Sequence, residues 1–124
     1  MAHRVLVVDD AIFMRNMIKD IFTQASEFEV VGEATHGLEA VERYRELKPD
    51  LVTMDIVMPF KSGIEATREI KKDDPDATII MCSALGQEQL VMEAIEAGAA
   101  DFIVKPFKAE EVLQVVRKVL GGDS

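Results

Sequence analysis

The feature that most restricts the fold of this chain is a regular alternation of two hydrophobic patterns. Short apolar runs rich in β-branched residues recur along the chain, at residues 4–8, 28–31, 51–54, 78–82 and 101–104. Longer amphipathic stretches separate them. Such alternation is typical of βαβ units, in which helices cover both faces of a parallel sheet. The sequence therefore predicts one α/β domain with five strands and five helices.

The amphipathic stretches carry boundary signals of helices. The second predicted helix spans residues 37–47, the third opens with the capping-box pair Ser62 and Glu65, and the fourth spans 87–97 before Gly98, a left-handed C-cap. The first helix has an apolar stripe whose methionines we interpret as core: Met14, Met17, Ile18, Ile21, Phe22 and Ala25. The last has a similar stripe and stops at two glycines: Val112, Leu113, Val116, Val119, Leu120, Gly121 and Gly122.

Composition excludes several classes of function. With 14 basic and 23 acidic residues the net charge is −9, so no basic surface for nucleic acid is expected. The single cysteine, Cys82, lies in an apolar run and is interpreted as core. We find no signal peptide, membrane span or linker, so we expect one cytoplasmic domain over residues 1–124, without an output domain.

Polar residues follow the predicted strands at the edge where an open parallel sheet binds ligands. They are Asp9 and Asp10 after the first run, Asp55 after the third, Ser83 after the fourth and Lys105 after the fifth. Exposed strand ends explain any one of these residues, but hardly all five. Three carboxylates at one site repel one another unless a cation is present. Their oxygen donors favour Mg²⁺ or Mn²⁺ over zinc.

An aspartate beside Mg²⁺ and a lysine can act as a nucleophile toward phosphorus, because the cations neutralise the charge on the phosphoryl oxygens. The sequence therefore predicts that Asp9, Asp10 and Asp55 bind one divalent metal ion and that Asp55 accepts a phosphoryl group.

These residues, with their neighbours, resemble the receiver domain of bacterial response regulators. The resemblance covers the whole chain and rests on Asp9-Asp10, Asp55 with Met58-Pro59, Ser83-Ala84 and Lys105-Pro106-Phe107. With Phe13-Met14-Arg15, it is greatest to chemotaxis regulators that consist of a receiver alone. It implies a doubly wound, flavodoxin-like five-stranded parallel sheet with strand order 2-1-3-4-5.

The resemblance also implies roles at the metal site. A chemotaxis histidine kinase would transfer its phosphoryl group to Asp55 with Mg²⁺ as cofactor, for which Mn²⁺ could substitute. Asp10, Asp55 and the backbone carbonyl of Val57 would ligate the metal, and Asp9 would act mainly through metal-bound water. The protein would be a signalling switch that catalyses only its own phosphotransfer and autodephosphorylation.

Further implied roles concern the phosphate and the switch. Lys105 would pair with Asp55 or its phosphate, Ser83 would bond a phosphoryl oxygen, and the Lys105–Pro106 peptide would be cis. Movement of Ser83 would let Phe102 turn inward and change a partner surface. We expect that surface to contain Val91, Ile95, Ala99, Phe102, Val104 and Val115. The implied partners are the flagellar motor switch protein and an aspartyl-phosphate phosphatase, with the chain itself a monomer.

Two departures from the family pattern concern loops. The segment 58–63 has Lys61 and Ser62 where the family usually has an apolar residue and Asp or Asn, which could alter docking of the kinase or the phosphatase. Val57 and Leu85 occupy positions that tune autodephosphorylation in the family. Neither can orient an attacking water, so slow intrinsic dephosphorylation is expected.

Three other functions were weighed. A haloacid-dehalogenase-type phosphohydrolase would also use an aspartyl phosphate, but Asp55-Ile56-Val57 lacks the second aspartate of that motif. A flavodoxin-type or nucleotide-binding domain would need a glycine-rich loop in place of Asp9-Asp10-Ala11-Ile12. A receiver that acts as a phosphorelay intermediate remains open, since only partner assays separate it from a motor-binding regulator.

Overall fold

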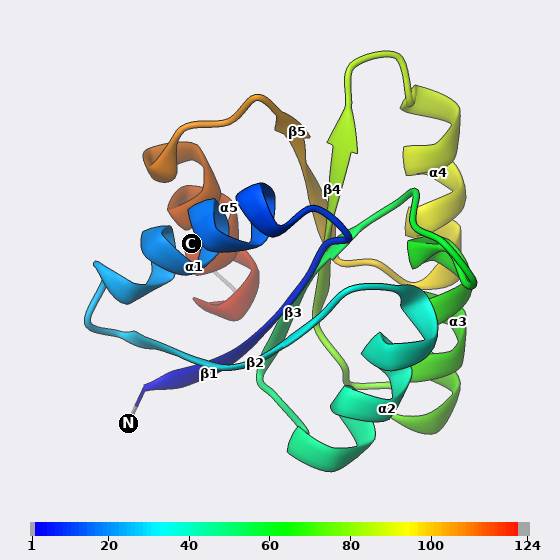
Figure 1. The fold of residues 1–124 in the computed structure, drawn as a ribbon, viewed down its shortest axis with the longest axis horizontal. Coiled ribbons are helices and arrows are strands. Elements are labelled where there is room, and N and C mark those ends of the chain that lie inside the picture. The colour runs from blue at the N-terminus through cyan, green and yellow to red at the C-terminus, as the bar shows by residue number, and fades with distance from the viewer. Residues whose placement is uncertain (1, 122–124) are drawn as a thin grey trace.

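The computed structural model describes residues 2–121, which form five strands and five helices in alternation (Figure 1). The strands are β1 (His3–Val8), β2 (Phe28–Ala34), β3 (Leu51–Asp55), β4 (Ile79–Ala84) and β5 (Asp101–Lys105). The helices are α1 (Ile12–Thr23), α2 (Gly37–Leu47), α3 (Gly63–Asp73), α4 (Glu88–Ala97) and α5 (Ala109–Gly121). The strands are parallel in the order β2-β1-β3-β4-β5, which confirms the predicted sheet.

Helices cover both faces of this sheet. Helices α1 and α5 lie on one face, and α2, α3 and α4 lie on the other (Figure 1). In the sheet, β2 lies on one side of β1, and β3, β4 and β5 follow in order on the other side. The C-terminal ends of β1 and β3 therefore flank the switch point where open α/β sheets bind their ligands.

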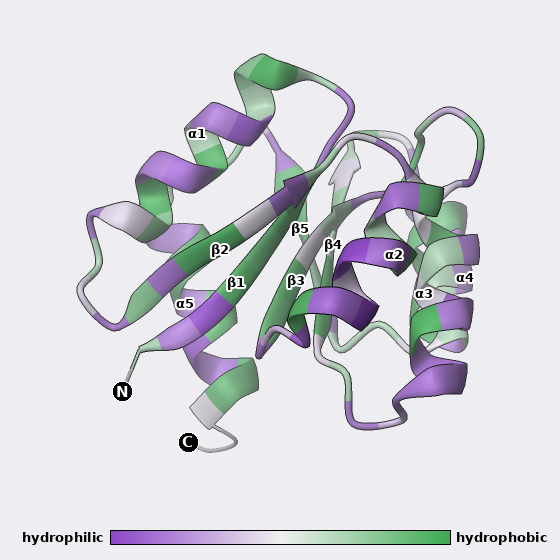
Figure 2. Ribbon diagram, turned by 60° about the horizontal axis from the view of Figure 1, so that its bottom comes forward, coloured by the Kyte–Doolittle hydropathy of each residue, from purple (hydrophilic) through white to green (hydrophobic). Residues whose placement is uncertain are grey.

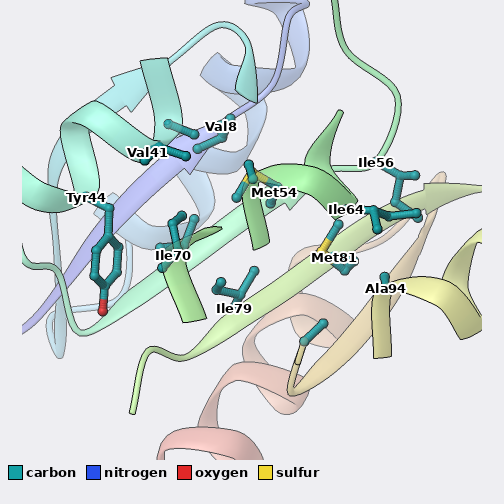
Figure 3. Close-up of a cluster of buried hydrophobic side chains, with 14 of the residues drawn as sticks. Val8, Val41, Tyr44, Met54, Ile56, Ile64, Ile70, Ile79, Met81 and Ala94 are labelled. Atoms are coloured by element: carbon teal, nitrogen blue, oxygen red, sulfur yellow. The ribbon is translucent and has the colours of Figure 1, made fainter. Parts of the chain in front are cut away.

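Each face of the sheet has its own apolar cluster. Met54 and Met81 point into the cluster beneath α2, α3 and α4, together with Tyr44 and Ile70 from the helices (Figure 3). Phe22 of α1 packs in the cluster on the opposite face. Because successive strand residues alternate between these faces, strands covered on both sides are mostly apolar, whereas each helix has an apolar face and a polar face (Figure 2).

Several local predictions are confirmed. Ser62 Oγ accepts from the Glu65 N–H at 3.2 Å while the Glu65 side chain accepts from the Ser62 N–H at 3.1 Å, which completes the capping box of α3. Gly98 caps α4 with φ of 117°. Cys82 is buried, and burial raises the pKa of its thiol to about 12.

Within residues 2–121, none of the helices is long and apolar enough to cross a membrane.

Other predictions need correction. Strand β2 continues three residues beyond the predicted end at residue 31, because residues 32–34 pair with the end of β1. Strand β4 extends to Ala84, so Ser83 lies within the strand. Met14 and Met17 share a face with Ile18 and Ile21 but are only half-buried, because the buried residues of α1, Ile18, Ile21 and Phe22, all lie in its C-terminal half. Gly121 lies in α5, and the predicted stop at Gly122 falls outside the described residues.

Candidate functional site

Three carboxylates meet at the C-terminal edge of the sheet. Val8 of β1 is in register with Met54 of β3, so Asp9, just after β1, and Asp55, the last residue of β3, lie side by side. Asp10 follows directly. One carboxylate oxygen from each of the three lies within 4.8 Å of the others. Asp9 is 1% exposed, the Asp55 side chain is 13% exposed, and Asp10 faces solvent.

Lys105 brings a cation into this group from the end of β5. Its Nζ lies 3.2 Å from Asp9 Oδ2 and 3.3 Å from Asp55 Oδ1, so one ammonium is shared by two carboxylates. Burial lowers the pKa of Lys105, but attraction to Asp55 and Asp9 outweighs it and raises the pKa overall. Lys105 therefore stays charged at neutral pH.

The site is short of positive charge. Burial and the neighbouring Asp9 raise the pKa of Asp55 to about 6, although Lys105 opposes both effects. Three carboxylates and one ammonium leave an excess of two negative charges when all are ionised. The donors that converge here are hard oxygens without histidine or cysteine, so the residues fit a small divalent cation such as Mg²⁺.

Ser83 lies on β4, between the strands that carry Asp55 and Lys105. Its side chain is buried, and its Oγ donates to the main-chain oxygen of Ile103 at 3.5 Å. That bond is at the long limit for a hydroxyl donor, so little is lost when the hydroxyl turns to another acceptor. Phe102 is 38% exposed on β5.

The predicted cis peptide at Lys105–Pro106 is present. Val57 lies in the loop after β3 with its side chain 56% exposed, and Leu85 is 77% exposed in the loop after β4. The metal-ligand role of the Val57 carbonyl stays a prediction.

The predicted partner surface is only partly assembled. Ile95, Phe102 and Val104 line a groove of about 480 Å³ between α4 and β5, with Val91, itself nearly buried, at its floor. Val115 lines a separate depression beside Phe102. Ala99 is 7% exposed and packs in the core, because its N–H bonds to the Ala94 oxygen just after the C-cap of α4. Its assignment to the surface is wrong for this structure.

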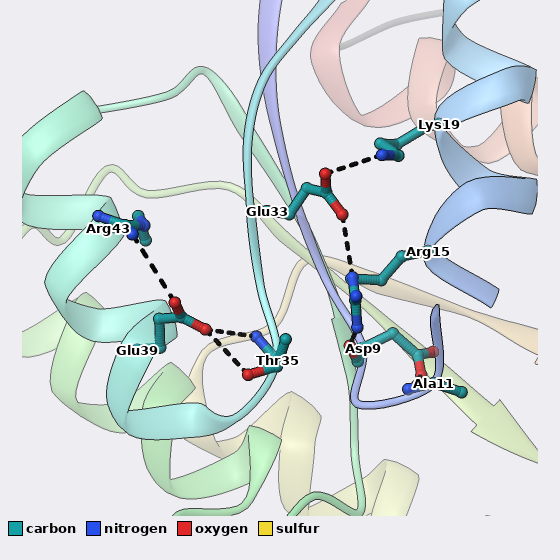
Figure 4. A network of polar contacts seen from close by, with 8 residues as sticks. All are labelled: Asp9, Ala11, Arg15, Lys19, Glu33, Thr35, Glu39 and Arg43. Carbon is teal, nitrogen blue, oxygen red and sulfur yellow. Dashed lines mark hydrogen bonds and ion pairs between the residues drawn. The ribbon is translucent and has the colours of Figure 1, made fainter. Parts of the chain in front are cut away.

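Contacts that the sequence analysis missed surround Asp9 (Figure 4). Arg15 Nη1 donates to the Asp9 main-chain oxygen at 2.8 Å, and Arg15 Nε donates to Glu33 Oε1 at 2.9 Å. Lys19 Nζ donates to Glu33 Oε2 at 2.7 Å. An arginine near a helix N-terminus is electrostatically unfavourable, and that signal in the sequence could have indicated a specific role.

A second missed contact joins the loop before α2 to the loop after β3. His36 Nδ1 accepts from the Glu39 N–H at 3.1 Å and so caps α2. The His36 ring meets Phe60 edge-on with centroids 4.9 Å apart. Phe60 is 85% exposed and has φ of 68°, which is rare for a bulky residue.

Comparison with known proteins places these observations in a family. The model of the response regulator receiver domain matches residues 5–117. The chain is 62% identical to the chemotaxis protein CheY of Thermotoga maritima, covering 96% of this chain and 98% of that one. It is 61% identical to CheY of Bacillus subtilis, with 97% and 99% covered.

A solved structure is similar over nearly the same length. The crystal structure of a CheX–CheY–BeF3–Mg²⁺ complex from Borrelia burgdorferi contains a chain that matches with a TM-score of 0.89 and 42% identity, covering 94% of this chain and 88% of that one.

Proposed function

We propose a function that follows from the family to which the chain belongs, that of the response regulator receiver domain. It is a CheY-like regulator of two-component signalling. We infer that it accepts a phosphoryl group on Asp55 from a phosphohistidine of a chemotaxis histidine kinase, in a reaction that requires Mg²⁺. The observation that carries this proposal is Lys105 Nζ held between Asp9 and Asp55, beside the Asp10 carboxylate.

In this proposal, the residues of the site have distinct roles. Asp9, Asp10 and Asp55, with the Val57 carbonyl, would hold Mg²⁺, which when bound supplies positive charge against the phosphoryl oxygens. A carboxylate oxygen of Asp55 bonds to phosphorus while the phosphorus–nitrogen bond breaks, and the imidazole leaves with the electron pair and takes up a proton from solvent. The Lys105 ammonium donates to a phosphoryl oxygen and stabilises the charge that is transferred. The chain acts as a switch that catalyses only its own phosphotransfer and autodephosphorylation.

Phosphorylation would then change the groove beside α4. The Ser83 hydroxyl leaves the Ile103 oxygen for a phosphoryl oxygen, and Phe102 turns inward from its half-exposed position. A shift in population from 1:99 to 99:1 requires about 5.5 kcal/mol. Hydrogen bonds to a charged group contribute roughly 1.5–3 kcal/mol each, so two or three of them suffice.

The phosphorylated surface is proposed to bind the flagellar motor switch protein, and an aspartyl-phosphate phosphatase is proposed to reset it. Support comes from the CheY relatives, which are chemotaxis proteins, and from the similar CheY chain that was solved in complex with CheX. In this structure Ile95, Phe102 and Val104 already line an apolar groove next to Ser83.

The chemistry is tested by intact-protein mass after mixing with a small acyl phosphate. We expect one phosphoryl adduct on the native chain in Mg²⁺, and none with a chelator or in Asp55→Asn. An adduct that persists in Asp55→Asn or in chelator would contradict the proposed chemistry.

The partner role needs a separate measurement, with the motor switch protein as titrant. Phe102→Ala should form the adduct normally and bind that protein more weakly than the native phosphorylated chain. Transfer of the phosphoryl group from Asp55 to a second histidine-containing protein would instead identify a phosphorelay intermediate.

A further inference from the structure

Arg15 is a buried cation in a place that helix electrostatics do not favour. It lies near the N-terminus of α1, where the helix dipole is positive, and the first turn of α1 contains no acidic residue. Only 11% of its side chain is exposed, although arginine is rarely buried. A specific set of acceptors must offset these costs.

The guanidinium of Arg15 has acceptors on two different segments (Figure 4). Its Nε donates to Glu33 on β2, and its Nη1 donates to the main-chain oxygen of Asp9. The rigid fork of a guanidinium holds two acceptors at a set separation, which a lysine ammonium does not do. Arg15 thereby ties the end of β2 to the turn after β1.

Glu33 is itself fixed in place. A hydrogen bond from Lys19 and a second from Arg15 lower the pKa of Glu33 and outweigh the opposing effect of burial. The carboxylate is therefore ionised at neutral pH and bound from both sides. The acceptor of Arg15 Nε is thus a carboxylate that a second cation, Lys19, also binds.

The carbonyl that Arg15 holds belongs to the peptide between Asp9 and Asp10. The other polar atoms of Asp9 are held too: its N–H donates to the Ala34 oxygen at 3.1 Å, Oδ1 accepts from the Ala11 N–H at 2.9 Å, and Oδ2 accepts from Lys105. Rotation of this one peptide would redirect two carboxylates of the acidic cluster. Arg15 is thus placed to control their direction although its hydrogen bonds go to neither carboxylate.

We propose that Arg15 is a positioning residue that sets the geometry of the divalent-metal site through the Asp9 carbonyl, with Glu33 as its second acceptor. The proposal rests on the proposed function, because it concerns the Mg²⁺ that phosphorylation of Asp55 would require. Groups that orient metal ligands typically change metal affinity about 10- to 100-fold when they are removed.

Electrostatics alone make the opposite prediction. Arg15 is a positive charge next to a site that takes up a cation, so its removal makes the local potential more negative and should tighten Mg²⁺ binding. A positioning role requires weaker binding. The sign of the change therefore separates the two explanations.

The experiment is calorimetric titration of Mg²⁺ into the unphosphorylated full chain and three variants. Arg15→Lys keeps the charge but not the fork, Arg15→Ala removes both, and Lys19→Ala removes a cation from Glu33 without touching Asp9. We expect affinity to fall about tenfold in both Arg15 variants and to stay equal or rise in Lys19→Ala. The rate of adduct formation should return to within about twofold of native when Mg²⁺ saturates Arg15→Lys, which a general folding defect would not allow.

Each outcome decides the proposal. Mg²⁺ affinity in Arg15→Lys equal to native overturns it, and so does tighter binding in Arg15→Ala. If Arg15→Ala does not fold, Arg15→Lys carries the same comparison. If the native chain binds no Mg²⁺ and forms no adduct, both the proposed function and the positioning role of Arg15 are refuted. If the native chain does both and the Arg15 variants match it, only the positioning role fails.

Discussion

At the scale of single residues, the fold places Asp55 in surroundings that disfavour its charge. Its carboxylate is largely withdrawn from solvent and lies beside Asp9, so its pKa rises from 3.8 to about 6 despite the ion pair with Lys105. A carboxylate whose pKa is higher in the folded state stabilises the fold only while it is protonated. That contribution is complete below pH 3.8 and is lost as the pH rises through about 6.

The first prediction is that Asp55→Asn stabilises the metal-free protein at pH 7.5 by about 2 kcal/mol, since it removes the charge that burial and Asp9 disfavour. At pH 4 the gain should nearly vanish. Urea unfolding in chelator, followed by circular dichroism, measures the stability at both pH values. Asp20→Asn, at an exposed position of α1, is the control. An Asn variant that is no more stable than native at pH 7.5 would show that Lys105 already balances the site.

A second residue, Thr53, lies two positions before Asp55 and therefore on the same face of β3. Its side chain is fully buried, and among the described residues its hydroxyl has no hydrogen-bond partner. The second prediction is that Thr53→Val raises the unfolding free energy by about 1 kcal/mol, because valine has nearly the same shape and lacks the unpaired hydroxyl.

Thr67→Val is the matched control for that substitution. Thr67 is equally buried, but its hydroxyl donates to Met81 Sδ at 3.5 Å, so its replacement should gain less. If Thr53→Val is instead destabilising in the same urea titration, its hydroxyl has a partner such as a buried water.

At the scale of elements, the loop between β3 and α3 is joined to the site by close backbone packing. The Gly63 N–H donates to the Ile56 oxygen at 2.8 Å, and the Gly37 N–H donates to the Lys61 oxygen at 3.0 Å. A Cβ on Gly63 would collide with the carbonyl oxygen of Asp55. The start of α3 can therefore touch the backbone of Asp55 only because residue 63 has no side chain.

The third prediction is that Gly63→Ala lowers the unfolding free energy by about 2–4 kcal/mol, because the backbone must shift to admit a methyl group. It should also slow phosphorylation of Asp55. Gly121→Ala is the control, since a Cβ there meets nothing within 4 Å and alanine favours a helix. Equal stability of the two variants in urea would refute the close-packing argument.

At the scale of the whole molecule, one sheet separates two apolar clusters. The central strands β1, β3 and β4 each contribute side chains to both clusters. Leu51 belongs to the cluster beneath α1 and α5, whereas its neighbour Val52 belongs to the cluster beneath α2, α3 and α4. Neither cluster can lose its strands without exposing the other. The domain should therefore unfold as a single cooperative unit.

The fourth prediction uses Tyr44 as a probe, because the chain has one tyrosine and no tryptophan. Tyr44 of α2 belongs to the cluster between the sheet and α2, α3 and α4, whereas Phe22 lies in the cluster on the opposite face. Phe22→Leu should lower stability by about 1–1.5 kcal/mol and shift the urea midpoint of Tyr44 fluorescence as much as that of circular dichroism. Ile70→Val, in the cluster of Tyr44, serves as control, and a Tyr44 signal that ignores Phe22→Leu would mean the two faces unfold separately.

The sequence by itself determined the elements and the chemistry at their ends. Hydrophobic periodicity is local, so it placed ten elements and predicted Asp9, Asp55 and Lys105 at one edge of the sheet. Family resemblance supplied the strand order and the cis peptide. The boundaries differ from the prediction: β2 and β4 extend further than their predicted apolar runs, because pairing with neighbouring strands continues past polar or glycine residues.

Only the tertiary structure decided which side chains from distant segments meet. The contact of Arg15 with Asp9 and Glu33 depends on how α1 lies across the ends of β1 and β2, and no local pattern encodes that placement. The burial of Ala99 likewise follows from its packing in the core beneath α2, α3 and α4. Periodicity fixes which face of an element is apolar, whereas the depth of each residue and the polar partner it finds depend on the packing of elements that are far apart in the chain.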